Sequence, residues 1–184
     1  MKKRWIALIV IGTALATLLA SRSIASTTQS MKAGTWVFEF HTTNVQPVGM
    51  LAVFTGSGQI MFSDRTDFGW TPPGAQTVYD SQCGVQPGAP QAGETQSPGY
   101  GTWRMNGAKV EFMVLSYRYD AQGNPIGTLR ATGSSKPGLR KINGTATIQW
   151  LKDGEDELNG AEACHIDVTY SGRKVPAVQP PTGQ

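Results

Sequence analysis

The stretch from Gly99 to Gly133 constrains the fold more than any other part of the chain. It contains two hairpin signals. The first is Asn106-Gly107, because a type I′ turn needs positive φ at both central positions. The second runs from Asp120 to Gly123 and ends on a glycine that a left-handed position favours. The three flanking segments are rich in β-branched and aromatic residues, which predicts an antiparallel three-stranded meander.

Alternation of apolar and polar residues predicts five further strands. In the first of them Trp36, Phe38 and Phe40 share one face. The five strands are expected over residues 35–41, 49–55, 59–63, 139–151 and 164–170. Eight antiparallel strands can close into a barrel, which removes exposed edges and leaves room for side chains or one small ligand. The predicted fold class is therefore all-β, a single antiparallel eight-stranded barrel, with a β-sandwich as the alternative.

The N-terminal residues have the pattern of a signal peptide over 1–25. A basic stretch at Lys2–Arg4 precedes the apolar run Trp5–Ala20, and Ser23–Ala25 supplies small residues for cleavage before Ser26. An uncleaved membrane anchor is the alternative, although the run is shorter than the ~20 residues that a span needs. We expect a secreted or periplasmic protein with no membrane insertion after processing. Its formal net charge would be −1, so nothing basic argues for a nucleic-acid partner.

The barrel domain is expected over residues 34–171, with a long loop at 64–98 and a disordered tail at 172–184. The loop contains five prolines and no sustained period, and loops of this length are commonly lids or insertions. We expect no helix of more than a turn or two anywhere in the chain.

The chain has two cysteines, Cys83 and Cys164. In an oxidising compartment an isolated pair most simply forms one disulfide, which would pin the middle of the loop to the last strand. Two free buried thiols are the alternative.

Three motifs carry a resemblance. They are the Gly-x-Gly-x-Trp strand that starts at Gly99, the hairpin from Arg118 to Gly123, and Cys164 on a late strand. In these motifs the chain resembles a widespread set of uncharacterised secreted bacterial proteins. These are similar in layout to calycin-like barrels of the lipocalin and allene oxide cyclase kind. The motifs are turns and packing aromatics, so the resemblance implies the fold and transfers no catalytic residue.

The catalytic residues cannot be assigned from the sequence. There are only two histidines and no Gly-x-Ser-x-Gly elbow. Gly99 and Gly101 open a strand instead of a helix, which excludes a dinucleotide loop there. We expect no cofactor and no metal, and whether the protein is an enzyme stays open.

The leading hypothesis is a barrel that binds a small, mostly apolar molecule. The candidate ligand-binding residues are Trp36, Phe38, Trp103, Glu111, Tyr117 and Trp150. The aromatic residues among them can equally fill the core. Strand 108–119 is apolar on both sides, so the sequence does not show which side faces the barrel interior.

Two alternatives involve this strand. One is a cyclase- or isomerase-type enzyme for a small hydrophobic substrate, with Glu111 as the acid and Tyr117 as the phenol. The other is a homodimer or larger homo-oligomer through the outer apolar face of Val110–Tyr119. Arg104, Arg118 and Arg130 lie on consecutive strands, and we interpret them as unrelated surface charges in preference to a cluster.

Closure of an up-and-down barrel makes the first and last strands antiparallel neighbours. Pairing 35–41 with 164–170 places His41 near His165 and Glu39 near Asp167. Exposed polar contacts are the favoured interpretation, and a zinc site is the alternative.

Overall fold

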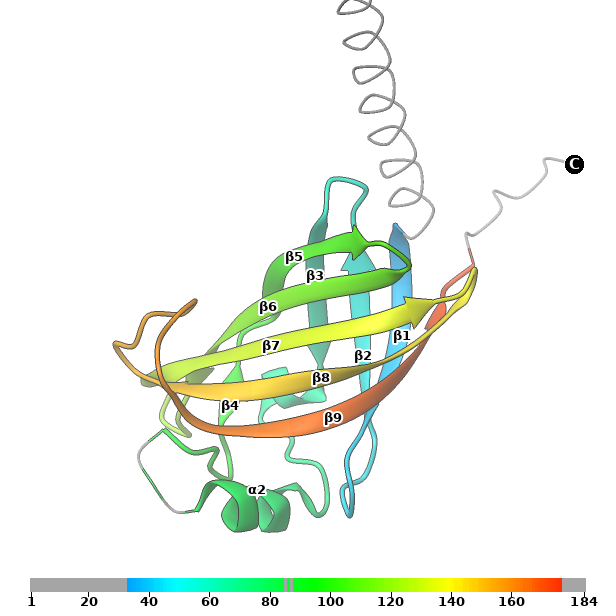
Figure 1. The fold of residues 1–184 in the computed structure, drawn as a ribbon. Helices are drawn as coiled ribbons and strands as arrows, with labels where there is room; N and C mark the ends of the chain where they lie inside the picture. The colour runs from blue at the N-terminus through cyan, green and yellow to red at the C-terminus, as the bar shows by residue number, and fades with distance from the viewer. Residues whose placement is uncertain (1–32, 85, 87, 177–184) are drawn as a thin grey trace, which may run out of the picture.

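Eight strands hydrogen-bond into a closed antiparallel barrel, which confirms the predicted fold class (Figure 1). The computed structural model describes residues 33–84, 86 and 88–176. Around the barrel the order is β6-β5-β3-β2-β1-β9-β8-β7, and the pairing of β6 with β7 closes the ring. The strands are β1 (Gly34–His41), β2 (Val48–Phe54), β3 (Gln59–Asp64), β5 (Gly99–Asn106), β6 (Lys109–Tyr119), β7 (Pro125–Pro137), β8 (Lys141–Lys152) and β9 (Glu162–Lys174).

β1 and β9 are neighbours, as predicted, but their register differs from the expected one. His41 lies opposite Thr169 and Glu39 opposite Ser171, so the prediction of His41 near His165 and Glu39 near Asp167 is wrong. The reason is that β9 continues to Lys174, which moves its pairing with β1 toward its C-terminal end.

The two histidines instead lie beside separate glutamates. His165 contacts Glu162 at 2.6 Å, and His41 lies 3.9 Å from Glu39. Within the described residues, no group of three or more His, Cys, Asp or Glu side chains is placed to hold a metal ion.

One end of the barrel is filled by aromatic side chains. Phe54 packs edge-on against Trp103, with ring centroids 5.3 Å apart, and Trp36 packs beside Phe54 at 6.3 Å. The indole Nε1 of Trp103 donates to the carbonyl of Thr55 at 3.0 Å. All three rings are buried, so side chains close this end, which carries the turn between β2 and β3.

The segment between β3 and β5 covers the other end (Figure 1). It contains the 3-10 helix η1 (Arg65–Phe68), the helix α2 (Ala75–Cys83) and the two-residue strand β4 (Thr95–Gln96), which pairs with the end of β6. The nine-residue α2 corrects the expectation that no helix exceeds a turn or two. No helix within the described residues is long and apolar enough to span a membrane.

The turn between β8 and β9 lies over the outer face of the barrel. Arg130 points outward from β7, yet it is only 8% exposed, because it donates to the carbonyl of Leu158 at 2.5 Å and to Gln149 at 2.8 Å. Arg104 is exposed and Arg118 lies inside the barrel, so the three arginines occupy separate places.

β1 begins at Gly34 and β9 ends at Lys174, so residues 172–174 of the predicted tail lie in a strand. The predicted signal peptide and residues 177–184 lie outside the described residues, so the signal peptide and its cleavage stay predictions.

Candidate ligand-binding cavity

A cavity of about 120 Å³ lies inside the barrel, between the aromatic end and the η1–α2 segment. Its wall is formed by inward-facing side chains of β1, β2, β3, β6, β7, β8 and β9 and is mostly apolar. The wall includes Phe38, Phe40, Ala52, Phe62, Phe112, Leu129, Ala131, Ile148, Trp150, Ile166, Val168 and Tyr170. Gln46 in the β1–β2 turn lines the cavity and is exposed, so the cavity reaches the surface beside this turn.

Small residues at inward positions create the space. Ala52 and Ala131 are buried and line the cavity, where longer side chains would fill it. Gly133, two residues further along β7, makes room for the ring of Phe112, which a Cβ at this position would overlap. The cavity therefore depends on short side chains among bulky aromatic ones.

Tyr170 is the centre of an aromatic cluster in the wall. Its ring centroid lies 5.7 Å from Phe38, 5.4 Å from Phe40 and 5.8 Å from Phe112. Burial raises the pKa of the Tyr170 phenol to about 12, so the neutral form is present at physiological pH.

The end of the cavity beneath η1 and α2 is polar. There the Oδ1 atom of Asp64 accepts hydrogen bonds from the backbone N–H and the hydroxyl of Thr66, at 2.6 and 2.5 Å. Gln96 of β4 donates to the same hydroxyl oxygen at 2.6 Å. Burial raises the pKa of Asp64, and the hydrogen bonds from Thr66 act in the opposite direction.

Tyr79 extends this polar end from α2. Its ring packs edge-on against Trp150, with centroids 5.4 Å apart. Burial raises the pKa of Tyr79 to about 12, and the negative charges of Glu94 and Asp64 act in the same direction.

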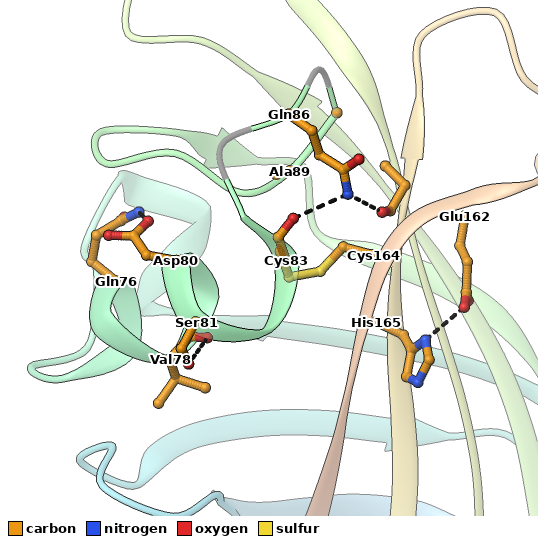
Figure 2. Close-up of a disulfide and its surroundings, with 12 residues drawn as sticks. Gln76, Val78, Asp80, Ser81, Cys83, Gln86, Ala89, Glu162, Cys164 and His165 are labelled. Carbon is orange, nitrogen blue, oxygen red and sulfur yellow. Dashed lines mark hydrogen bonds and ion pairs between the residues drawn. A yellow bond between two sulfur atoms is a disulfide. The ribbon is translucent and has the colours of Figure 1, made fainter.

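A disulfide between Cys83 and Cys164 fixes the last residue of α2 to β9, which confirms the predicted bond (Figure 2). Beside it, the Gln86 side-chain amide donates to the carbonyls of Cys83 at 3.0 Å and Ala163 at 2.5 Å. The segment between β3 and β5, residues 65–98, forms the cap of the barrel. The backbone N–H of Gln46 donates to the carbonyl of Pro73 in this cap at 3.0 Å. The cap is thus attached to both β9 and the β1–β2 turn.

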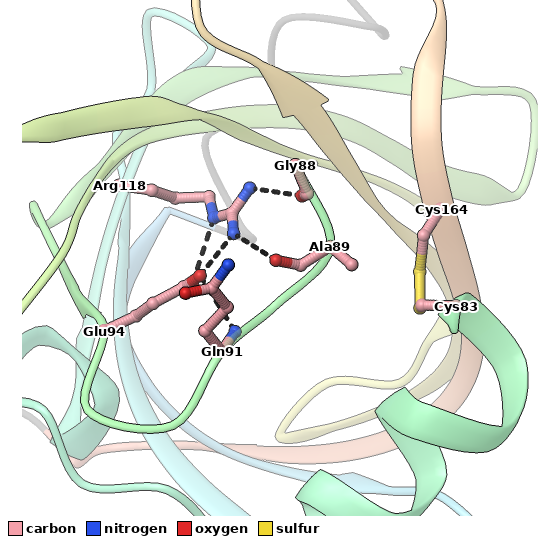
Figure 3. Close-up of polar contacts among 7 residues, drawn as sticks. All are labelled: Cys83, Gly88, Ala89, Gln91, Glu94, Arg118 and Cys164. Carbon is pink, nitrogen blue, oxygen red and sulfur yellow. Dashed lines mark hydrogen bonds and ion pairs between the residues drawn. A yellow bond between two sulfur atoms is a disulfide. The ribbon is translucent and has the colours of Figure 1, made fainter. Parts of the chain in front are cut away.

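Arg118 holds the remaining part of the cap (Figure 3). It points inward from the end of β6 and donates to both carboxylate oxygens of Glu94 and to the carbonyls of Gly88 and Ala89. The guanidinium thus fixes the segment before β4 across the end of the barrel.

The structure places four of the six candidate ligand-binding residues inside the barrel. Phe38 and Trp150 line the cavity. Trp36 and Trp103 are buried in the closed end and fill the core.

Glu111 and Tyr117 lie on the outer face of β6 and do not line the cavity. Glu111 accepts hydrogen bonds from Arg104 at 3.0 Å and Asn106 at 2.7 Å, whereas Tyr117 is 51% exposed. The inward positions of β6 belong to the alternate residues from Val110 to Arg118, which include the buried Ser116. The placement of Glu111 and Tyr117 as a catalytic pair in the cavity is therefore corrected.

Sequence reasoning did not identify Asp64, Tyr79 and Tyr170 as cavity residues. Asp64 continues the alternation of Ile60 and Phe62, so its inward position was accessible from the strand pattern. Tyr79 has no such signal, because α2 is weakly amphipathic and lies within a segment without a clear period.

No protein-family model matches this chain, and searches of curated proteins and of solved structures find no match either. The structure itself therefore defines the class of protein. The protein is a closed eight-stranded antiparallel barrel of calycin-like layout with an apolar internal cavity.

Proposed function

We propose that this protein binds a small, mostly apolar molecule inside the barrel. This proposal is based on the cavity of about 120 Å³, which has aromatic and aliphatic walls. An apolar cavity of about 150 Å³ in another protein stays dry and takes up benzene. The volume here favours a ligand of similar size, such as one aromatic ring or a short aliphatic chain.

Calorimetric titration with toluene tests the proposal. We expect one molecule to bind per chain, and Ala131→Leu to abolish the binding because the longer side chain fills the cavity. The matched control is Thr132→Leu, since this neighbour points outward from the same strand. Absence of toluene binding, or equal binding by the two variants, would contradict the proposal.

We also propose that the protein acts outside the cytoplasm. The disulfide supports this, since such bonds persist in oxidising compartments. Expression with its own N-terminal segment, followed by N-terminal sequencing of the exported product, should give a chain that begins at Ser26. Retention of the intact chain in the cytoplasm would contradict this localisation.

Self-association is a second candidate, favoured by an exposed apolar strip on the barrel. Val53, Met61 and Tyr100 are 40%, 47% and 56% exposed, and they lie opposite one another on β2, β3 and β5. On β6, Leu115 lies opposite Tyr100 and extends the strip to the predicted outer face of this strand. Light scattering should then show a dimer that Met61→Lys dissociates, whereas a strict monomer would exclude this function.

A further inference from the structure

The cavity contains a carboxylate without a basic partner. Asp64 is the only acidic residue of its wall, and neither Lys nor Arg lines it within the part of the chain that the structure describes. Asp64 also takes part in none of the ion pairs found among those residues. Arg65, its neighbour in sequence, lies over the ring of Trp70, and the next charged residue, Asp67, is another carboxylate.

The carboxylate of Asp64 has room for a further hydrogen-bond donor. Oδ1 accepts both hydrogen bonds from Thr66, and the backbone N–H of Asp67 also donates to this carboxylate, which caps η1. A carboxylate has about four acceptor sites, so one is left for a ligand. Asp64 is only partly buried, and its place in the cavity wall lets a molecule inside the barrel reach it.

Aromatic rings form much of the surrounding wall. Phe62 precedes Asp64 by two residues on the same face of β3, and Phe40, Phe112, Tyr79 and Tyr170 line the same space. Aromatic faces attract cations as well as apolar groups, and a buried carboxylate is stabilised by a cation that replaces its lost hydration.

We propose that the ligand is an arylalkylamine, with its ring among the aromatic side chains and its ammonium group paired with the carboxylate of Asp64. This inference rests on the proposed function and narrows it to one chemical class. A ligand with a carboxylate would meet the charge of Asp64 at close range and without compensation, and would be excluded. A neutral ligand of the same shape would fill the cavity but leave Asp64 unpaired.

The other charged groups near this end do not supply the missing cation. Arg118 is engaged by Glu94 at 2.6 Å and does not line the cavity. His41, the remaining wall residue that can become cationic, lies at the rim beside Glu39 with its side chain 41% exposed. Arg65 lies over the ring of Trp70 and is absent from the wall.

Calorimetric titration with three matched probes tests the inference. These are 2-phenylethylamine, the neutral 2-phenylethanol and the anionic phenylacetate. We expect the amine to bind about tenfold more tightly than the alcohol, or better, and phenylacetate to bind least. Asp64→Asn keeps an oxygen for Thr66 but removes the charge, so it should abolish the preference for the amine and leave alcohol binding within about twofold.

Asp67→Asn is the matched control. It removes one negative charge three residues away, from a side chain that binds Ser63 at 2.6 Å and does not line the cavity. This variant should keep the preference for the amine.

The outcomes separate the two proposals. Binding of 2-phenylethanol without tighter binding of the amine would overturn this inference and leave the proposed function intact. An equal effect of the two variants would also overturn it. Failure of toluene and of all three probes to bind would overturn both.

Discussion

Arg118 and Glu94 form a buried ion pair that joins β6 to the covering segment. Their Nη2 and Oε1 atoms lie 2.6 Å apart, and the side chains are 1% and 12% exposed. The same guanidinium donates to the carbonyls of Gly88 at 2.8 Å and Ala89 at 3.2 Å. A buried guanidinium with four acceptors fixes the position of the cap more firmly than an exposed pair can.

Glu94→Gln should destabilise the fold by about 3 kcal/mol, because it leaves the Arg118 charge buried without its counter-charge. Denaturant titration measures the effect. The control is Glu111→Gln, which breaks the exposed pair with Arg104 and should cost much less, because water screens an exposed ion pair. Equal effects of the two substitutions would contradict the role assigned to Arg118.

Loss of the disulfide should destabilise the protein by about 4 kcal/mol, since the bond closes a long loop between residues 81 positions apart. Replacing both cysteines by serine should lower the melting temperature. Proteolysis should then cut first between Asp64 and Pro98, the segment that Cys83 anchors. An unchanged melting temperature, or first cleavage elsewhere, would argue against this role.

Alkaline conditions should destabilise the fold through Tyr79 and Tyr170. Their pKa is about 12 in the folded protein, against about 10 for an unfolded phenol. Because folding raises the pKa of each phenol, the buried neutral phenol contributes fully to stability below pH 10. This contribution is lost as the pH rises toward 12. The loss is about 1.4 kcal/mol per pH unit for each phenol.

Denaturation at several pH values between 10 and 12 measures this slope. Tyr79→Phe should roughly halve it, whereas Tyr100→Phe, at an exposed position, should leave it unchanged. A slope that Tyr79→Phe does not reduce would show that the Tyr79 phenol does not cause the loss of stability at alkaline pH.

Gly101→Ala should destabilise the barrel by about 3 kcal/mol or more, because a Cβ would overlap the backbone carbonyl of Met113 on β6. Thermal melting tests this. Gly49→Ala on β2 is the control, since the space around that position is open and the change should be small. Similar melting temperatures for the two variants would show that β5 and β6 do not approach so closely.

Much of the barrel was predictable because its inward residues are large and apolar. The alternation of Trp36, Phe38 and Phe40 identifies β1 directly, and the cysteine pair identifies the attachment of the cap. The register of β9 was not predictable in this way. Its inward position after Tyr170 is Gly172, where a side chain would overlap Phe38, so the apolar pattern stops before the strand does.

The inward face of β6 was ambiguous for a related reason. Its inward positions include Ser116 and Arg118, whereas Met113 and Leu115 point outward. Arg118 is placed inside by Glu94 and two carbonyls from a segment without periodic structure. Such long-range partners leave no pattern in the local sequence, which is why the inward face of β6 could not be predicted and Glu111 and Tyr117 were included among the candidate ligand-binding residues.

Binding of an apolar molecule inside the barrel is tested by a crystal structure of the protein soaked with bromobenzene, whose bromine is located by anomalous scattering. We expect one bromine inside the barrel, in contact with Phe112, Ile148 and Tyr170, and no bromine there in Ala131→Leu. A barrel interior filled by side chains, with bromine found only on the outer surface, would contradict it.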